Sequence, residues 1–220
     1  MNEYQDLEQA LNVFVGKWKP IIIYHLTNDG TKRYSDLQRA IPEITKRMLT
    51  LKLRELEESG IVSRKVYNQV PPKVEYSMTE YGLTLHPLLV KMNDWGEGHR
   101  RPKDHKDQVE HANHACKALT TIDTIIGKWK SIIISELASE DLRFSDLQKR
   151  IPQISRTMLT NNLKQLEQEG IVHREVHQQV PPKVVYSMTE YGKTLKPILQ
   201  DLNQWGEEFI KRQENVSGAE

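Results

Sequence analysis

The residues of this sequence that could react or hold a metal lie in one polar stretch near its middle. The only cysteine, Cys116, follows His105, His111 and His114. Thiolate and imidazole are the ligands that Zn²⁺ prefers in proteins, but this spacing matches none of the usual zinc-binding patterns, and the rest of the stretch is charged. We therefore predict no metal site and no cofactor.

Cys116 can instead be interpreted as a sensor of an oxidant or electrophile effector. That role requires an accessible thiol of low pKa, and Lys117 with the nearby histidines would favour the thiolate. Because the chain has no second cysteine, its chemistry would be an intermolecular disulfide, alkylation or mixed thiolation. An inert cysteine is the alternative. A single cysteine also fits a reducing cytoplasm, where we expect the protein to be.

Basic and hydroxyl side chains gather at two places, each shortly after an Ile-Pro pair. They are Thr45-Lys46-Arg47 and Ser155-Arg156-Thr157. Such side chains hydrogen-bond the phosphates and base edges of DNA. The net charge of +1 argues against a basic coating over the whole protein, so a DNA-binding surface must come from local clusters.

Nearly the whole chain is an internal repeat, which we divide into a first copy and a second copy. GKWKPIII at Gly16 returns as GKWKSIII at Gly127, and QVPPKVEYSMTEYG at Gln69 returns as QVPPKVVYSMTEYG at Gln179. Each copy is long enough to form a domain. We predict domains over residues 1–98 and 116–213, a polar linker or connecting helix over 99–115, and a disordered tail over 214–220.

Each copy is predicted to begin with helices. In the first copy, apolar spacing predicts a helix over Leu7–Val15 and another that begins near Lys17. The spacing of Ser35 and Gln38 predicts a capping box at the start of a short helix. Ile41-Pro42 ends that helix, because a proline disfavours helical geometry in the residue before it.

The second part of each copy is predicted to hold a long helix and a hairpin. Thr45, or Ser155 in the second copy, caps a helix that ends at a glycine and turns a leucine stripe toward the core. Short β-type runs over Ile61–Val66 and Val74–Met78 flank a Pro-Pro-Lys tip. Thr79 then caps a last helical region over Leu83–Trp95, which Pro87 breaks or kinks. This order predicts a mainly α fold with small β-hairpins: two tandem winged helix-turn-helix domains that form a pseudo-dimer.

The motifs of both copies resemble the HxlR-type winged-helix transcriptional regulators of bacteria and archaea. They are GKW with an aliphatic run, SDLQxxIP, MLTxxL, LExxGIV, VPPKVxYSMTEYG and a closing WG, over Glu8 to Gly96 and Leu119 to Gly206. The resemblance implies a homodimer that binds operator DNA and pairs through terminal helices. It also implies a cysteine at the position of Cys116, which some members use as a sensor. Fusing two copies departs from the family and leaves open whether the chain acts as a monomer.

The DNA-contacting residues follow from the place of the recognition helix, whose outward N-terminal residues face base edges. With Leu49 and Leu53 turned inward, the predicted set is Thr45, Lys46, Arg47, Thr50 and Arg54 in the first copy and Ser155, Arg156, Thr157, Thr160, Asn161 and Lys164 in the second. The alternative is an ordinary solvated helix face. Lys73 and Lys183, beside the hairpin tips, are predicted to contact a phosphate or the minor groove. Because the two sets differ, the operator can be an imperfect palindrome.

The sequence thus predicts a transcriptional regulator that binds specific double-stranded DNA through two half-sites. Its modulator would be Cys116 chemistry or a small molecule at the domain interface. The tryptophans Trp18, Trp95, Trp129 and Trp205 can be read as a ligand box, but aromatic residues among aliphatics at helical spacing favour core or dimer interface. A winged-helix protein-interaction module is the alternative function. No enzyme motif is present, and no apolar run is long enough for a membrane span.

Overall fold

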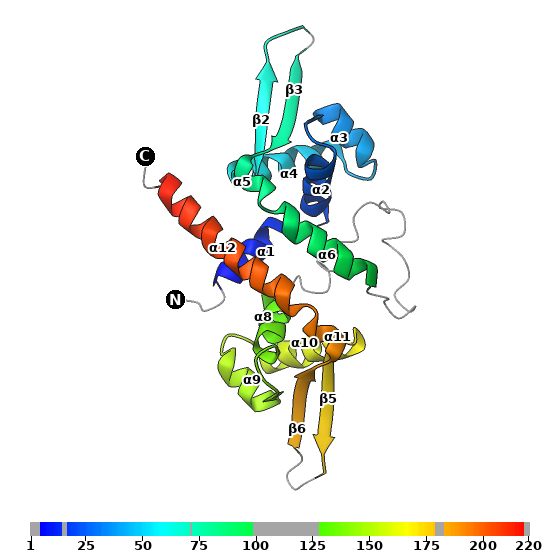
Figure 1. Ribbon diagram of the computed structural model, residues 1–220, viewed down its shortest axis with the longest axis vertical. Helices are drawn as coiled ribbons and strands as arrows, with labels where there is room; N and C mark the ends of the chain where they lie inside the picture. Colours follow the sequence, from blue (N-terminus) through cyan, green and yellow to red (C-terminus); the bar gives the residue numbers. More distant parts are fainter. Residues whose placement is uncertain (1–4, 15–16, 71, 99–127, 179–182, 218–220) are drawn as a thin grey trace.

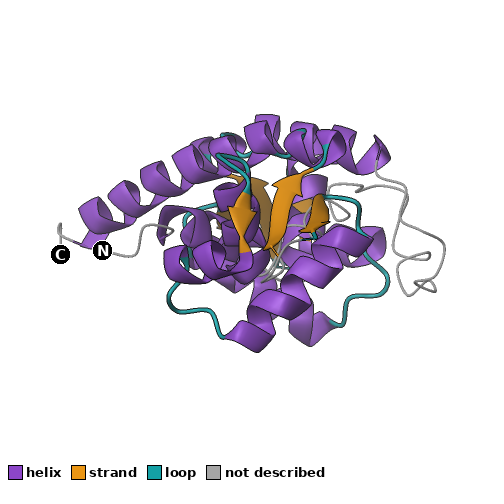
Figure 2. Cartoon of the chain, turned by 90° about the horizontal axis from the view of Figure 1, so that it is seen from below, coloured by secondary structure: helices purple, strands orange, loops and turns teal. Residues whose placement is uncertain are grey.

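The structure is a computed structural model that describes residues 5–14, 17–70, 72–98, 128–178 and 183–217. It is elongated, with a β-hairpin pointing outward at each end and helices from both copies crossing in the middle (Figure 1). Along the long axis the hairpins are seen end-on, with helices around them (Figure 2). The predicted fold class, mainly α with small hairpins in two winged helix-turn-helix units, is confirmed.

From α2 in the first copy and α8 in the second, the described parts of the two copies contain the same elements in the same order. The first copy holds α1 (Gln5–Phe14), α2 (Trp18–Asn28), β1 (Lys32–Arg33), α3 (Tyr34–Ala40), α4 (Lys46–Glu58), β2 (Val62–Tyr67), β3 (Lys73–Met78), α5 (Glu80–Leu83) and α6 (His86–Gly98). The second holds α8 (Lys128–Leu137), β4 (Leu142–Arg143), α9 (Phe144–Arg150), α10 (Arg156–Gln168), β5 (Val172–His177), β6 (Lys183–Met188), α11 (Glu190–Lys193) and α12 (Lys196–Ser217).

The predicted caps of the long helices are confirmed. The Thr45 hydroxyl accepts a hydrogen bond from the Met48 backbone N–H at 3.2 Å, and Ser155 does the same for Met158. These bonds satisfy an N–H that has no partner inside the helix. Thr79 also caps a helix, but that helix is the short α5.

The predicted capping box at Ser35 is wrong. Helix α3 begins one residue earlier, at Tyr34, and its N-cap is Arg33. The Arg33 backbone N–H donates to the Asp36 carboxylate at 3.2 Å. A carboxylate near the positive end of a helix is stabilised more strongly than a hydroxyl, so Asp36 takes the role predicted for the Ser35–Gln38 pair.

Each hairpin belongs to a three-stranded antiparallel sheet, and the third strand was not predicted. In the first copy the order is β1-β3-β2, with Lys32 opposite Tyr76 and Val66 opposite Val74. The second copy repeats it as β4-β6-β5. The extra strand ties the start of the helix-turn-helix to the root of the hairpin, so the two parts of the unit are held in one orientation.

The last helical region differs from the prediction. Its first part, α5, ends at Leu83, and α6 begins at His86, so Pro87 lies in the first turn of a new helix, where its missing N–H costs nothing. In the second copy α12 continues to Ser217. Residues 214–217 are therefore helical, as the last turn of a helix that packs along α1, and the predicted disordered tail is wrong for them.

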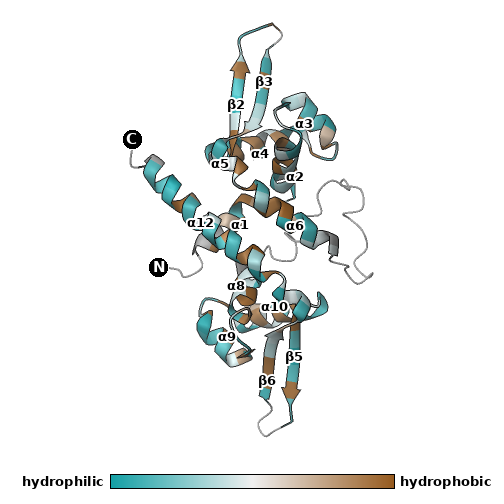
Figure 3. Cartoon of the chain, in the orientation of Figure 1, coloured by the Kyte–Doolittle hydropathy of each residue, from teal (hydrophilic) through white to brown (hydrophobic). Residues whose placement is uncertain are grey.

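The core of each copy lies under the long helix of its helix-turn-helix. The predicted stripe Leu49, Leu53 and Leu56 is fully buried, and its counterpart in α10 is buried as well. Apolar residues also cover α6 where the copies meet, while α3 and α9 are mostly hydrophilic (Figure 3). No helix within the described ranges is both long and apolar enough to cross a membrane.

Candidate nucleic-acid interface

In the first copy, the predicted DNA-contacting side chains lie on or beside α4, and most point into solvent. Thr45, Lys46, Arg47 and Arg54 are exposed. Thr50 is half-buried and is held by its neighbours. Lys46 and Arg47 are therefore displayed on the first turn of the helix, where side chains can reach base edges and phosphates, and Arg54 lies two turns further along.

Tyr34 explains why Thr50 is held, and sequence reasoning missed it. The Tyr34 hydroxyl donates to the Lys46 carbonyl oxygen at 2.8 Å and lies 3.1 Å from the Thr50 hydroxyl. Thr50 itself donates to the Lys46 carbonyl at 2.9 Å. The first turn of α4 is thus tied to the start of α3. An aromatic residue at the same place in both copies, Tyr34 and Phe144, was the signal available in the sequence.

The second copy holds its recognition helix differently. Phe144 has no hydroxyl, and the Arg156 guanidinium lies 5.7 Å from the centre of its ring. The other predicted residues, Thr157, Thr160, Asn161 and Lys164, are exposed. Thr160 donates to the Arg156 carbonyl of its own helix. The two recognition helices therefore present different groups with different freedom.

Two further lysines near α4 are not free for DNA. Glu55 accepts from Lys52 at 2.7 Å and from Lys19 at 3.0 Å. Burial raises the pKa of Glu55, but the hydrogen bonds from both lysines outweigh it and lower that pKa overall. The carboxylate therefore stays ionised and neutralises part of the basic charge behind the recognition helix.

The first hairpin restrains its lysine. Lys73 opens β3 opposite Tyr67, and its ammonium lies 2.6 Å from the Glu75 carboxylate and 4.4 Å from the Tyr67 ring centre. The Lys73 hydrogen bond, followed by one from Tyr67, lowers the pKa of Glu75. Glu75 also faces Lys65 across the ladder. Lys73 is therefore already paired before any phosphate arrives.

The second hairpin lacks this restraint because Val185 stands in place of Glu75. Val185 faces Glu175 across the ladder, and Glu175 lies 3.8 Å from the His177 ring nitrogen. Lys183 opens β6 and makes no ion pair with any residue of the described ranges. The single difference between QVPPKVEYSMTEYG and QVPPKVVYSMTEYG thus decides whether the hairpin lysine is paired within its own wing.

The copies meet through two reciprocal tryptophan contacts. The Trp95 indole N–H donates to the Thr194 hydroxyl at 2.8 Å, and the Trp205 N–H donates to the Thr84 hydroxyl at 2.9 Å. Trp95 stacks on Tyr191, and Trp205 stacks on Tyr81. Since each contact joins equivalent positions of opposite copies, the contact is isologous, as at a two-fold axis. This confirms the interface interpretation for Trp95 and Trp205.

Helices are also exchanged between the copies. Helix α1 of the first copy packs along α12 of the second (Figure 1). At the far end of α12, Arg212 lies over the Tyr81 ring at 4.7 Å, and Gln213 donates to the Ser59 carbonyl. The C-terminal half of α12 thus holds the first copy in place.

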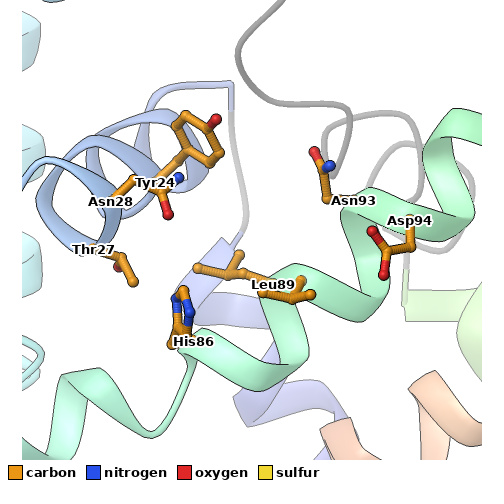
Figure 4. Close-up of a pocket in the computed structure, with 8 residues that line it drawn as sticks. Tyr24, Thr27, Asn28, His86, Leu89, Asn93 and Asp94 are labelled. Atoms are coloured by element: carbon orange, nitrogen blue, oxygen red, sulfur yellow. The ribbon is translucent and has the colours of Figure 1, made fainter.

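Two hollows lie near this contact. One, of about 310 Å³, is between α6 and α12 and is lined by Leu88, Lys91, Asp201 and Trp205, among others. A second, of about 160 Å³, lies between α2 and α6 of the first copy (Figure 4). Tyr24, Thr27, Asn28, His86, Leu89, Asn93 and Asp94 surround it. In the second copy only Leu89 and Asn93 are kept, as Leu199 and Asn203, whereas Ser135, Ala138, Ser139, Lys196 and Gln204 stand at the other five positions. The residues that line this hollow therefore differ between the copies.

The cysteine and the histidines singled out by sequence lie outside the described residues. These are Cys116, His105, His111 and His114, together with the predicted linker. Within the described ranges, no group of His, Cys, Asp or Glu side chains is arranged to hold a metal ion.

Comparison with known proteins gives the same repeat. The family described as HxlR-like helix-turn-helix matches residues 13–104 and again residues 124–214. The HTH-type transcriptional regulator YdeP of Bacillus subtilis is 52% identical over 109 residues, which cover 50% of this chain and 82% of YdeP. YybR of the same organism is 57% identical over 94 residues, 43% of this chain and 74% of YybR.

Relatives extend to an archaeon and to solved structures. An HTH-type regulator of Methanothermobacter thermautotrophicus is 41% identical over 109 residues, 50% of this chain and 83% of that protein. The structure of the redox regulator HypR in its oxidized form is 57% identical, with a TM-score of 0.40, and covers 43% of this chain and 96% of its own. Because the family matches most of the chain in two consecutive segments, the protein belongs to the HxlR-like helix-turn-helix family and carries the family's unit twice.

Proposed function

We propose that the protein is a transcriptional regulator whose two copies read two half-sites of one double-stranded operator. The observation that carries this is the duplicated recognition helix: α4 and α10 each begin at a hydroxyl cap and display basic and polar side chains into solvent. Family membership supports the same function. Lys46, Arg47 and Arg54 in α4, and Arg156 and Lys164 in α10, are the proposed contacts.

The two half-sites should differ in sequence. Lys46-Arg47 of the first copy is replaced by Arg156-Thr157 in the second, and Leu51 is replaced by Asn161. An arginine reads guanine through two hydrogen bonds, whereas an asparagine suits adenine. The operator would therefore be an imperfect palindrome that the chain occupies in a single orientation.

The domain limits and the effector also belong to this proposal. We place the two DNA-binding units at residues 1–98 and 116–213, with residues 99–115 as the connection. Cys116 is proposed as the site of oxidant or electrophile chemistry, because it is the only thiol and Lys117 follows it. The hollow between α6 and α12 is the alternative site, for a small molecule that would change the angle between the copies.

Selection of bound genomic DNA by the purified protein, with and without a thiol oxidant, tests this function. The bound fragments should contain two half-sites about one helical turn, roughly 34 Å, apart. A band-shift titration should then show one chain on each operator. A chain with Cys116→Ser should bind equally with and without the oxidant.

The substitutions Lys46→Ala and Arg156→Ala test the residues. Each should weaken binding. The fall of log affinity with log salt should become less steep, by about 0.9 for each phosphate that the variant no longer neutralises. Lys193→Ala is the matched control, since Lys193 is an exposed lysine of the short α11. A protein-interaction module would show weak binding with no preferred sequence, and the two substitutions would change nothing.

A further inference from the structure

An ion pair between Lys91 of α6 and Asp201 of α12 joins the copies where these helices meet. The Lys91 ammonium lies 2.5 Å from the Asp201 carboxylate. The same two residues line the hollow between the helices. Beyond position 34 the repeat has an offset of 110, so Lys91 and Asp201 are equivalent positions of the two copies. A residue of one copy thus faces its own counterpart.

Such self-facing positions lie on the axis of an isologous contact. The reciprocal bonds from Trp95 to Thr194 and from Trp205 to Thr84 establish that the contact has this symmetry. If two first copies paired in the same way, two lysines would meet on the axis. If two second copies paired, two aspartates would meet. Only a first copy with a second copy places opposite charges together.

We propose that the Lys91–Asp201 pair is a pairing code, through which each copy selects its unlike partner in the same chain and rejects a like copy from another chain. Two identical copies cannot encode such a pair, because a single sequence gives both sides of the axis the same charge. The fusion of two diverging copies makes it available. The surface around α6 therefore fits one partner, the surface of α12.

The end of α12 supplies an independent preference in the same direction. Arg212 and Phe209 of the second copy cover Tyr81 of the first. The counterparts of these residues in the first copy are Pro102 and His99, which provide no guanidinium and no phenyl ring. Two first copies would therefore lack this cover. Two second copies would keep the residues, so the acidic repulsion at Asp201 is what disfavours that pairing.

The size of the effect follows from the exposure of the pair. The side chains are 51% and 36% exposed, and exposed ion pairs shift an equilibrium by about 1.4-fold to 5-fold. In a like pairing the two charges repel, which shifts that pairing toward dissociation by a similar factor. The two factors multiply in the ratio of unlike to like pairings. We therefore expect discrimination on the order of tenfold between the unlike and like pairings at low salt, and less at high salt.

Charge reversal in the full-length chain tests the code. Lys91→Asp makes both axis positions acidic, Asp201→Lys makes both basic, and the double variant restores an opposite pair. Each single variant should have an unfolding equilibrium shifted toward the unfolded state by about 2-fold to 10-fold, and the double variant should recover most of it. If the double variant is destabilised as much as the sum of the singles, the code is overturned.

Mixing the single variants gives the decisive measurement. An acidic chain and a basic chain can form two opposite pairs only by pairing with each other. One of the two variants is isotope-labelled, and the mixture is measured by native mass spectrometry. Mixed dimers should be several-fold more abundant than the dimers that either variant forms with itself. Mixed dimers at the statistical level would overturn the proposal.

A matched control reverses an ion pair that stays within one copy. Glu190→Lys and Lys193→Glu exchange charges that lie 2.6 Å apart in α11. Chains with these changes should form no mixed dimers when combined. None of these measurements uses DNA, so their outcome is separate from that of the proposed function.

Discussion

Trp205 donates its indole N–H to the hydroxyl of Thr84, 121 residues earlier in the chain. Thr84 in turn donates to the Tyr81 carbonyl at 2.6 Å, so the hydroxyl is oriented to accept. Trp205 is 6% exposed, and a buried indole N–H without an acceptor is costly. The bond therefore fixes the second copy against the turn between α5 and α6 of the first.

Removing the acceptor should destabilise the whole molecule. Thr84→Val leaves the indole N–H unpaired and should lower the free energy of unfolding by about 1–3 kcal/mol. Thr194→Val should cost a similar amount through Trp95. Urea unfolding followed by tryptophan fluorescence measures both. The combination of Thr84→Val with Trp205→Phe should cost less than the sum, and strict additivity would show that the bond contributes nothing.

Glu75 should weaken DNA binding by the first hairpin. Glu75→Val gives β3 the sequence of β6, frees Lys73 and removes a negative charge beside DNA. We expect tighter binding at low salt and a slope of log affinity against log salt that is steeper by about 0.9. Fluorescence anisotropy at several salt concentrations measures it.

The hairpin lysines provide the comparison for that prediction. Lys183→Ala should weaken binding more than Lys73→Ala, since Lys73 is paired with Glu75 at 2.6 Å. With Glu75→Val already in place, Lys73→Ala should become as harmful as Lys183→Ala. Equal reductions in affinity in the unmodified protein would contradict the assigned role of Glu75.

Tyr34 and Phe144 should set how strictly each recognition helix is held. Tyr34→Phe removes the hydrogen bond to the Lys46 carbonyl and leaves Thr50 without its tyrosine neighbour. The cost in unfolding free energy should be about 0.5–1.5 kcal/mol, and the base preference of the first half-site should relax. Selection of bound DNA by the variant reads that preference. Base preference should stay unchanged in the second half-site, which serves as the internal control.

The parts of the fold that the sequence predicted are local. Thr45 and Ser155 cap helices because the bond closes within three residues of the chain. The leucine stripe of α4 could be read from its period alone. Strand β1 has only two residues, too few for an alternating pattern, so nothing in its own sequence indicates pairing with β3. Asp36 and Ser35 are both good helix-start residues, and only the backbone geometry decides between them.

The parts that could not be predicted join distant positions. The contacts Trp95–Thr194 and Lys91–Asp201 require the arrangement of the copies, which no spacing within one copy contains. For the recognition helices, the outward direction of Lys46 and Arg47 followed from the leucine period. The hydrogen bond from Tyr34 that holds the first turn of α4 could not be predicted in this way, because the tyrosine lies twelve residues before Lys46. The length of α12 was missed because its support is α1, a helix of the other copy.

Alkaline titration should reveal the interface tyrosines. Burial raises the pKa of Tyr81 to about 12, with Glu208 adding to the effect and Arg212 opposing it, and burial alone raises the pKa of Tyr191 to about 12. A folded-state pKa above the ordinary value near 10 means that the folded protein holds the proton longer. The stabilisation is complete below pH 10 and is lost as the pH rises toward 12.

Phenolate absorbance during that titration measures the effect. Tyr81 and Tyr191 should ionise late, together with a loss of stability in urea. The pKa of Tyr67 is raised as well, through its hydrogen bond to Glu75, so Tyr67 is expected to join them without reporting on the interface. Tyr81→Phe should remove one late proton. If all tyrosines ionise near pH 10 while the protein stays folded, the burial of these rings in solution is wrong.

Gly82 and Gly192 lie where helix α5 or α11 touches the backbone at the start of the hairpin. A Cβ on Gly82 would be 2.2 Å from the Ile61 carbonyl oxygen, and one on Gly192 would be 2.1 Å from that of Ile171. The Ile61 carbonyl cannot easily move, because it accepts the Thr79 backbone N–H at 3.0 Å. Gly82→Ala should therefore cost about 3 kcal/mol, and Gly192→Ala a similar amount. Gly98→Ala is the control, because a Cβ there would meet no described atom within 4 Å apart from its chain neighbours and its own helix. Gly98 is the last residue of α6, so the gain in helix propensity should be below about 1 kcal/mol. Urea midpoints of the three variants decide it: a Gly82→Ala protein as stable as the Gly98→Ala protein would mean that α5 and the hairpin are not in contact.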